Sequence, residues 1–221
     1  MGHPEIWGPA GERLLIVGLT GGIASGKTEV DRQLEKMGLL VIDADEVARC
    51  VVEPGTATYD TLVRQFGDRV LDPHGCIDRA ELASIVFSDD EKRMLLNSIT
   101  HPAIFQEMIR RVAEHAETLD PGDVPAVVLD AALIVDTGVS GVFDILAVVT
   151  ADEETRVKRM VQDRRMSQEE ARTRIASQTP DSKRIAMADI VIENNGTIDE
   201  LRESLVDAFQ DIAERAGRDY S

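Results

Sequence analysis

The chain has few aromatic side chains and no long hydrophobic run. Aromatic residues make up 4% of its 221 residues, although 43% of the residues are hydrophobic. This balance fits a soluble α/β protein better than a β-sandwich or a β-barrel. Every apolar run has the length of a strand and is too short to cross a bilayer, so we expect no membrane partner.

Cysteine is also scarce. Cys50 and Cys76 are the two cysteines of the chain, and their spacing matches neither a metal site nor a redox motif. Reduced thiols are typical of a cytoplasmic protein, which is the location we predict. Residues 1–13 contain no apolar core of the kind a signal peptide needs, and we expect them to form a flexible extension.

Positive charge is in short supply. Twenty-four Lys and Arg residues face 41 Asp and Glu residues, which gives a formal net charge of −17. This deficit argues against nucleic acid or an anionic membrane surface as a partner. If the chain binds a smaller polyanion, its basic residues must be concentrated locally, and their position should mark the site.

A phosphate-binding motif stands near the N-terminus. Residues 21–28 match the pattern G-x-x-x-x-G-K-[ST], between the apolar run 14–19 and an amphipathic segment with Val30 and Leu34 on one face. Backbone N–H groups of such a loop surround phosphate oxygens, the lysine reaches the β- and γ-phosphates, and the hydroxyl binds Mg²⁺. The expected nucleotide contacts are Gly22, Ile23, Ala24, Ser25, Gly26, Lys27 and Thr28, with Thr28 also on the metal.

Strand-like and helical segments alternate along the rest of the chain. After the first strand, further strands are expected at 39–42, 126–129, 145–149 and 190–192, with helical patterns between them. This alternation predicts a five-stranded parallel sheet covered on both faces. Residues 56–121 lack strand signals, and a long helix is expected to begin at Pro102. We therefore predict a nucleotide-binding core at 14–55 and 122–216 and a helical substrate-binding insertion at 56–121.

Two aspartates follow the second strand, at the sheet edge where ligands bind in open α/β folds. In an extended segment Asp43 and Asp45 present their carboxylates to one side. Asp43 with Glu46 also resembles a helix capping box, so Asp45 is the stronger candidate for a general base or metal contact. Asp130 and Asp136 each end an apolar run, and the pattern does not choose between them as the second Mg²⁺ carboxylate.

The scarce positive charge gathers between residues 155 and 185, where nine basic residues face four acidic ones. Arg156, Arg159, Arg172 and Arg174 fit a solvated helix face. Arg164 and Arg165 differ, because they lie at a joint between two helices, before the expected N-cap Ser167. A helical lid at about 156–184 can close an arginine onto the transferring phosphate and exclude water.

Two further features have competing interpretations. His101, before Pro102, is more typical of a capping or packing residue than of a ligand. Asn195 and Gly196 follow the last strand, where they form either an adenine contact or a simple turn.

Taken together, the motifs resemble the dephospho-CoA kinase family over residues 14–216. The resemblance depends on the segments 18–28, 42–45, 48–55, 101–102, 175–178 and 188–196. It implies a P-loop kinase core with a lid, and transfer of the γ-phosphate of Mg·ATP to the ribose 3′-hydroxyl of dephospho-CoA. It further implies Asp45 as base, Lys27 and Thr28 as phosphate and metal contacts, Arg164 as lid arginine, and substrate contacts at Asp43, Asp45 and His101.

The chain departs from the family where a Pro-Leu-Leu-x-Glu stretch usually follows the third strand. Residues 132–136 read Ala-Leu-Ile-Val-Asp instead, so Asp136, the expected metal ligand, has a shorter reach than the family's glutamate. Two alternatives stay open beside this resemblance. One is a kinase for another nucleoside or nucleotide, and the other is a nucleotide-dependent binding switch. The switch predicts a guanine-reading Asn-Lys-x-Asp motif, which the sequence lacks.

Overall fold

The computed structural model describes residues 6–7, 11, 13–87, 89–120, 122–131 and 143–217. The chain divides into two compact units, residues 1–41 with 114–221, and residues 42–113. The expected assignment of ATP to a core at 14–55 and 122–216, and of CoA to an insertion at 56–121, stays a prediction. Compactness alone does not identify a ligand.

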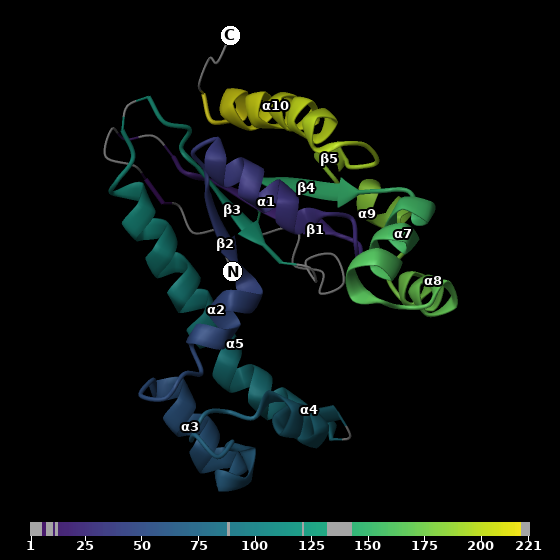
Figure 1. Cartoon of the computed structure of the whole chain (residues 1–221). Helices are drawn as coiled ribbons and strands as arrows, with labels where there is room; N and C mark the ends of the chain where they lie inside the picture. Colours follow the sequence, from purple (N-terminus) through teal and green to yellow (C-terminus); the bar gives the residue numbers. More distant parts are fainter. Residues whose placement is uncertain are drawn as a thin grey trace. The chain divides into compact units, whose positions relative to one another are not determined.

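The first unit is built on a parallel sheet (Figure 1). Its five strands follow the order β2-β3-β1-β4-β5, with β1 at Leu15–Gly21 in the centre. The other strands are β2 (Leu40–Asp43), β3 (Ala126–Asp130), β4 (Ile145–Thr150) and β5 (Ile190–Glu193). Strand β1 pairs in parallel with both β3 and β4, and β4 pairs in parallel with β5. The predicted α/β fold with a five-stranded parallel sheet is confirmed.

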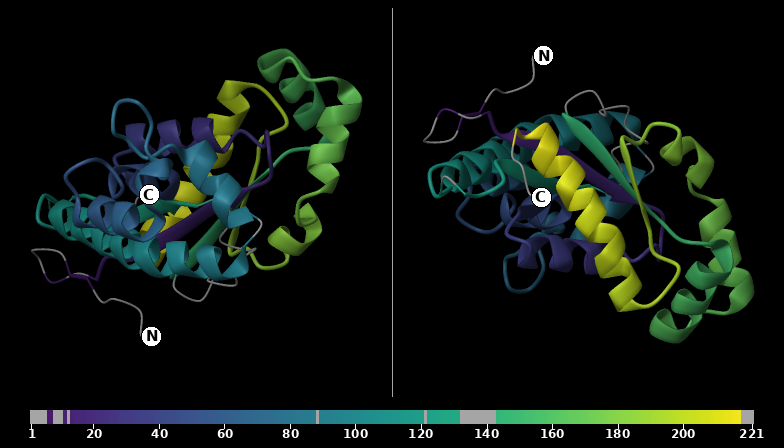
Figure 2. Two further views of the ribbon diagram at one scale, coloured as in Figure 1. Left: turned by 90° about the horizontal axis from the view of Figure 1, so that it is seen from below. Right: turned by 90° about the horizontal axis from the view of Figure 1, so that it is seen from above.

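One face of this sheet packs against two helices, α1 (Lys27–Lys36) and α10 (Ile198–Arg215). Alternate strand residues such as Val17, Val128 and Ala147 are buried there against Val30 of α1 and Leu205 of α10. Figure 2 shows α10 lying across the strands. Because β1 is buried on both faces, its residues are hydrophobic or small throughout, which is why a continuous apolar run predicted it.

The C-terminal half of the first unit carries α7 (Glu153–Arg164), α8 (Gln168–Ala176) and α9 (Asp181–Ile185). Helix α7 ends at Arg165, whose φ of 53° is left-handed, and α8 begins after Ser167. The Ser167 side chain accepts a hydrogen bond from the Glu170 N–H, so the predicted N-cap is confirmed. This helical hairpin occupies the segment in which a lid was expected.

The second unit is helical. It contains α2 (Ala44–Cys50), α3 (Ala57–Phe66), a short 3₁₀ turn at Asp68–Val70, α4 (Arg79–Phe87) and most of α5 (Asp90–Ala116). Its core gathers around Leu62, Phe66, Val70 and Leu82.

The expected start of a helix at Pro102 is wrong, because α5 begins at Asp90 and passes through this proline. Proline removes one N–H from the helix, a local loss of order 3 kcal/mol that the remaining hydrogen bonds of a long helix can offset. The apolar pattern at residues 94–99 therefore belongs to the same helix and not to a separate one.

No helix in the described part of the chain is long and apolar enough to cross a membrane. Cys50 and Cys76 are both free thiols, as expected.

Candidate active site

The loop at residues 21–28 joins β1 to α1 and has the backbone of a phosphate loop. Ala24 and Gly26 adopt positive φ angles of 59° and 92°, and α1 starts at Lys27. The first N–H groups of α1 therefore point into the loop without intrahelical partners. This arrangement, together with the positive end of the helix dipole, favours an anion.

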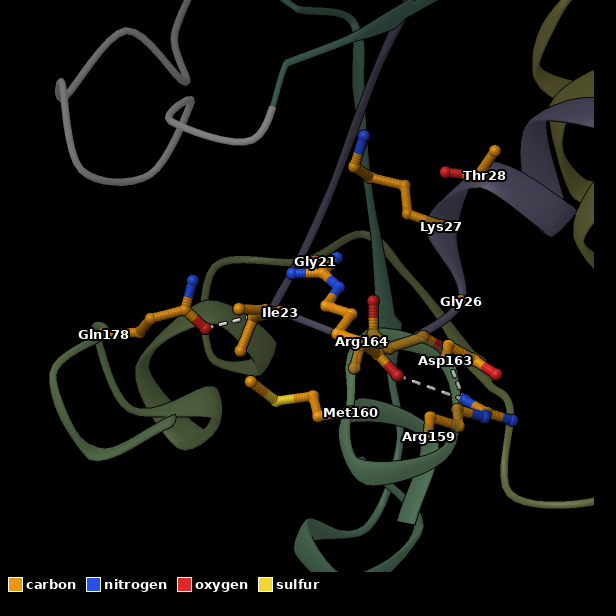
Figure 3. Close-up of a pocket in the computed structure, with 13 residues that line it drawn as sticks. Gly21, Ile23, Gly26, Lys27, Thr28, Arg159, Met160, Asp163, Arg164 and Gln178 are labelled. Carbon is orange, nitrogen blue, oxygen red and sulfur yellow. Dashed lines mark hydrogen bonds between the residues drawn. The ribbon is translucent and has the colours of Figure 1, made fainter. Parts of the chain in front are cut away.

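A cavity of about 430 Å³ opens over this loop (Figure 3). Its walls are the whole loop from Gly21 to Thr28, one side of α7, and Gln178. The α7 side chains that border it are Arg159, Met160, Asp163 and Arg164. Another cavity, of about 380 Å³, shares Gly26, Thr28, Arg159 and Asp163 with the first and extends to Asn194 and Gly196. The expected triphosphate residues thus border cavities that adjoin at Thr28 and Arg159.

Lys27 makes an ion pair with Asp130, at the C-terminal end of β3. Its ammonium group contacts both carboxylate oxygens, and the Asp130 side chain is buried. Between the two candidates that the sequence left open, Asp130 is the carboxylate that lies at the loop. Asp136 lies outside the described residues, so its expected metal role stays a prediction.

Arg159 and Asn194 approach the outer side of the loop. Arg159 donates through Nη1 to the carbonyls of Ser25 at 3.1 Å and Ala24 at 3.3 Å. Asn194 donates through Nδ2 to the same Ser25 carbonyl at 2.8 Å, and its own carbonyl accepts from Arg159 at 2.9 Å. Burial lowers the pKa of Arg159, although a guanidinium stays charged in proteins.

Arg156 is buried rather than solvated, with 3% of its surface exposed. Its guanidinium contacts the carbonyl of Ile23, Gln178 and Asp181. The interpretation of Arg156 and Arg159 as a solvated face is therefore wrong. The interpretation as a solvated face is correct for Arg172 and Arg174, which are exposed and pair with glutamates of α7 and α8. Arg156 lies on the face of α7 that also buries Val157 and Met160, and Arg159 is half-buried.

Arg164 is exposed and borders the cavity over the loop, where Figure 3 shows it beside the loop residues. Arg165 takes the left-handed position that ends α7 and does not border this cavity. Of the two adjacent arginines, Arg164 is therefore the one that faces a phosphate site.

Asp43 and Asp45 belong to the second unit. Asp43 is the N-cap of α2: its Oδ1 accepts from the Asp45 N–H at 2.7 Å and the Glu46 N–H at 3.2 Å. Its other oxygen lies 3.7 Å from Arg49. Asp45 lies in the first turn of α2 and is exposed, so the expectation of an extended Asp43–Asp45 segment is wrong. The expected capping box is half formed, since the Glu46 side chain pairs with Arg111 at 3.2 Å.

His101, Asn195 and Gly196 were also expected to contact a ligand, and they lie in different surroundings. His101 is exposed within α5. The Asn195 side-chain oxygen Oδ1 accepts a hydrogen bond from the Asp152 N–H at 2.7 Å, which fixes the loop after β5. Gly196 lies in the second cavity, close to Glu200: a Cβ at this position would be 2.0 Å from the Glu200 carboxylate. Their expected binding roles stay predictions.

The sequence reasoning missed Gln178, Asn194, Arg156 and Arg159 as partners of the loop. One signal for the arginines was available, because Arg156 lies beside Val157 and Met160 on the apolar face of α7. Gln178 accepts a hydrogen bond from the loop and Asn194 donates one to it, both across more than 150 residues, and no sequence pattern signals such distant contacts.

Comparison with known proteins places this chain among dephospho-CoA kinases. The family model described as dephospho-CoA kinase matches residues 15–200. The dephospho-CoA kinase of Corynebacterium efficiens is 45% identical over 189 residues, which cover 86% of this chain and 92% of that protein. The enzyme of the same name from Geobacillus kaustophilus is 43% identical over 192 residues, covering 87% and 94%.

Solved structures agree on the fold. The structure titled TT1252 from Thermus thermophilus aligns with a TM-score of 0.74 at 30% identity, over 90% of this chain and 97% of that one. A dephospho-CoA kinase structure from Campylobacter jejuni aligns with a TM-score of 0.58 at 23% identity, over 90% and 97%. At that identity the second likeness supports the fold alone.

Proposed function

The chain belongs to the dephospho-CoA kinase family, and from this premise we propose that it transfers the γ-phosphate of ATP to the ribose 3′-hydroxyl of dephospho-CoA. The products are coenzyme A and ADP, which makes the chain a phosphotransferase with an alcohol acceptor. The observation that carries the proposal is the family match over residues 15–200, which includes the phosphate loop and the arginine-bearing helix α7. The two alternatives, another nucleotide kinase and a binding switch, are not favoured.

The donor half of the site is the phosphate loop. Backbone N–H groups of Gly26, Lys27 and Thr28, at the start of α1, face the β-phosphate, and Lys27 exchanges its Asp130 partner for the β- and γ-phosphate oxygens when ATP binds. The lysine charge is therefore compensated by Asp130 before ATP binds and by phosphate afterwards. This matters because the site is largely buried: the Asp130 side chain is only 6% exposed. Arg164 supports the same phosphates from α7, where it borders the cavity.

Mg²⁺ fits the donors that the site offers. Magnesium prefers oxygen ligands, keeps several waters, and is held by one or two protein groups together with substrate phosphates. The Thr28 hydroxyl is exposed at the cavity, and the Asp130 carboxylate becomes available when Lys27 turns to phosphate. When bound, the ion neutralises charge on the phosphate oxygens.

The acceptor half is assigned to Asp45. Its carboxylate is exposed in the first turn of α2, and no side-chain partner for it occurs in the described part of the chain. It can therefore accept the proton of the attacking 3′-hydroxyl as that oxygen forms its bond to the γ-phosphorus. Asp43, which was expected to bind substrate, is already engaged as the α2 cap, and its role is to hold the helix that presents Asp45.

Two features of composition support the proposed ligands and the proposed location: basic residues are scarce, and both cysteines are free thiols. A net charge of −17 disfavours nucleic acid as a partner, so dephospho-CoA and ATP are the expected ligands. Two unpaired cysteines agree with a reducing compartment, and we assign the chain to the cytoplasm.

An assay of ADP release with different acceptors tests this function. Purified protein receives Mg·ATP together with dephospho-CoA, adenosine or AMP, and a coupled enzyme reports the ADP formed. We expect rapid turnover with dephospho-CoA and little with the other two. Lys27→Ala should reduce this turnover to a few per cent or less, because the β- and γ-phosphates lose their positive partner.

Either of two results would contradict the proposal. Preferential turnover of adenosine or AMP would favour a different kinase. Equal ADP release without any acceptor would exclude kinase activity and indicate a nucleotide-dependent switch.

A further inference from the structure

The phosphate loop is held by a buried arginine and by a glutamine at the edge of the cavity, and we propose that Arg156 and Gln178 are positioning residues for ATP. This inference rests on the proposed function only in taking ATP as the ligand of the loop. Neither residue is assigned to the reacting atoms. Their effect is on the loop, whose shape they fix before the nucleotide arrives.

Both polar backbone groups of Ile23 are bound by this pair. The Ile23 N–H donates to Gln178 Oε1 at 2.8 Å (Figure 3). The Ile23 carbonyl accepts from Arg156 Nε at 2.8 Å. The two side chains also meet each other, because Arg156 Nη2 donates to the same Gln178 oxygen at 3.1 Å. Both the backbone N–H and the backbone carbonyl of Ile23 are therefore held in place.

Arg156 is itself anchored by Asp181, the first residue of α9. Its Nη1 lies 2.5 Å from Asp181 Oδ2, while Arg184 Nη1 lies 3.0 Å from Asp181 Oδ1. The side chains of Arg156 and Arg184 are 3% and 2% exposed, so two buried guanidinium groups share one carboxylate. The excess positive charge lies directly behind the loop, where water screens it little.

The glycine at position 22 is an independent sign of this contact. A Cβ at Gly22 would lie 2.6 Å from Arg156 Nη2, so a side chain at this position would force the buried guanidinium to move. The loop pattern itself accepts any residue at that position. Glycine here therefore fits the close approach of Arg156 to the loop.

A loop fixed in this way binds phosphate at a lower entropic cost. If Ile23 were released, ATP would have to order the loop as it bound, and affinity would fall by the cost of that ordering. The acceptor would be unaffected, since these contacts involve the donor loop alone. Loss of Arg156 or Gln178 should therefore weaken ATP binding selectively.

Two variants of the full chain test this role: Gln178→Ala removes the acceptor for Ile23, and Arg156→Lys keeps the charge but loses the forked donor geometry. Calorimetric titration with Mg·ATP gives the Kd without any acceptor, and steady-state kinetics give both KM values. We expect the Kd and KM for ATP to rise about tenfold in each variant. The KM for dephospho-CoA should stay within twofold of the wild-type value.

Arg172→Ala is the matched control. It removes an exposed guanidinium that pairs with Glu153 and Glu154, so it changes the net charge without touching the loop. We expect its ATP affinity to stay within twofold of the wild type. A tenfold loss in this control as well would show that a change away from the loop weakens ATP binding equally, and would overturn the positioning role.

The inference is also wrong if folded Gln178→Ala binds ATP as tightly as the wild type. Circular dichroism and thermal melting establish folding, and Gln178→Ala, at a half-buried position, decides the outcome if Arg156→Lys does not fold. Tight ATP binding by wild-type protein that does not phosphorylate dephospho-CoA would overturn the proposed function and leave this inference standing.

Discussion

Asp43 and Asp45 are close in sequence but differ in what their carboxylates bind. The Asp43 carboxylate accepts two backbone N–H groups and thereby stabilises the first turn of α2. The Asp45 carboxylate is exposed and has no side-chain partner within the described residues. A cap typically contributes about 1 kcal/mol to a helix, whereas an unpaired carboxylate is available for chemistry.

Replacing Asp45 by Asn tests its role as base. Asn keeps the size of the side chain but cannot accept the proton of the attacking hydroxyl. We expect kcat to fall by roughly 10²-fold or more, while the Kd for ATP stays nearly unchanged. Steady-state kinetics with dephospho-CoA and direct titration with ATP measure the two quantities. A change in KM alone would make Asp45 a binding residue and not a base.

At the level of single residues, the sequence predicted the phosphate loop but not the side chains that hold it in place. The pattern at residues 21–28 located the turn between β1 and α1, because it requires glycine and a following helix. Arg156 and Arg159 were misread, since a run of basic residues on a helix usually faces solvent. Their burial depends on carbonyls of a loop more than 130 residues earlier, which no local pattern reports.

Helix α5 illustrates the same limit for whole elements. Proline at position 102 is an ordinary signal for the first turn of a helix, and it predicted a start there. In the structure the helix passes through Pro102 from Asp90 to Ala116. The strands were easier to predict, because buried parallel strands give continuous apolar runs. Their spatial order, with β1 between β3 and β4, comes from pairings between distant segments.

A cluster of charged side chains joins α2 and α5 within the second unit. Glu107 accepts hydrogen bonds from Arg110 at 2.7 and 2.8 Å and from Arg111 at 2.9 Å. Arg111 also reaches Glu46 of α2 at 3.2 Å. The hydrogen bonds from Arg110, followed by those from Arg111, lower the pKa of Glu107 to about 2.

This lowered pKa predicts how the stability of the second unit depends on pH. A carboxyl whose pKa is lower when folded stabilises the protein above its unfolded pKa, and that stability is lost as pH falls through the folded pKa. For Glu107 the loss extends from about pH 4.5 down to about pH 2. Glu107→Gln should lower stability near neutral pH by about 1 kcal/mol, since the group is partly screened by solvent. The difference should vanish near pH 2.

Urea unfolding followed at several pH values measures this effect. Glu53→Gln serves as the control, because Glu53 belongs to the same unit and its side chain is exposed. A stability difference for Glu107→Gln that persists unchanged down to pH 2 would show that the ion pairs are not its source.

For the molecule as a whole, the strong negative charge and the anionic ligand are compatible because of burial. The net charge is −17, yet Arg156, Arg159 and Lys27 all lie at the phosphate loop. Charges with little exposure are screened less than the carboxylates on the surface. The site can therefore attract a polyanion although the molecule carries excess negative charge.

The division into two units predicts where ATP alone stabilises the chain. The loop, α1 and α7 all belong to the first unit, so ATP at a hundred times its Kd should stabilise that unit by about 2.7 kcal/mol. Hydrogen exchange of β1, α1 and α7 should slow by up to about 100-fold. Exchange of α3 and α4, in the second unit, should change little until dephospho-CoA is added.

Mass spectrometry of deuterated peptides measures these rates. Lys27→Ala with the same ATP is the control, and its exchange should stay close to that of the nucleotide-free protein. Equal slowing of both units by ATP alone would show that they unfold as one cooperative block.

The central position of β1 has a consequence for how the chain is made. The phosphate loop leaves the ribosome more than 130 residues before its supports at Arg156, Gln178 and Asn194. Strand β1 also pairs with β3 and β4, which come later in the chain, so its backbone N–H and C=O groups stay unpaired until those strands have been made. A nascent chain that ends before Asn194 therefore lacks part of the hydrogen bonding that shapes the loop. We expect the loop to bind ATP tightly only after these later segments have been made.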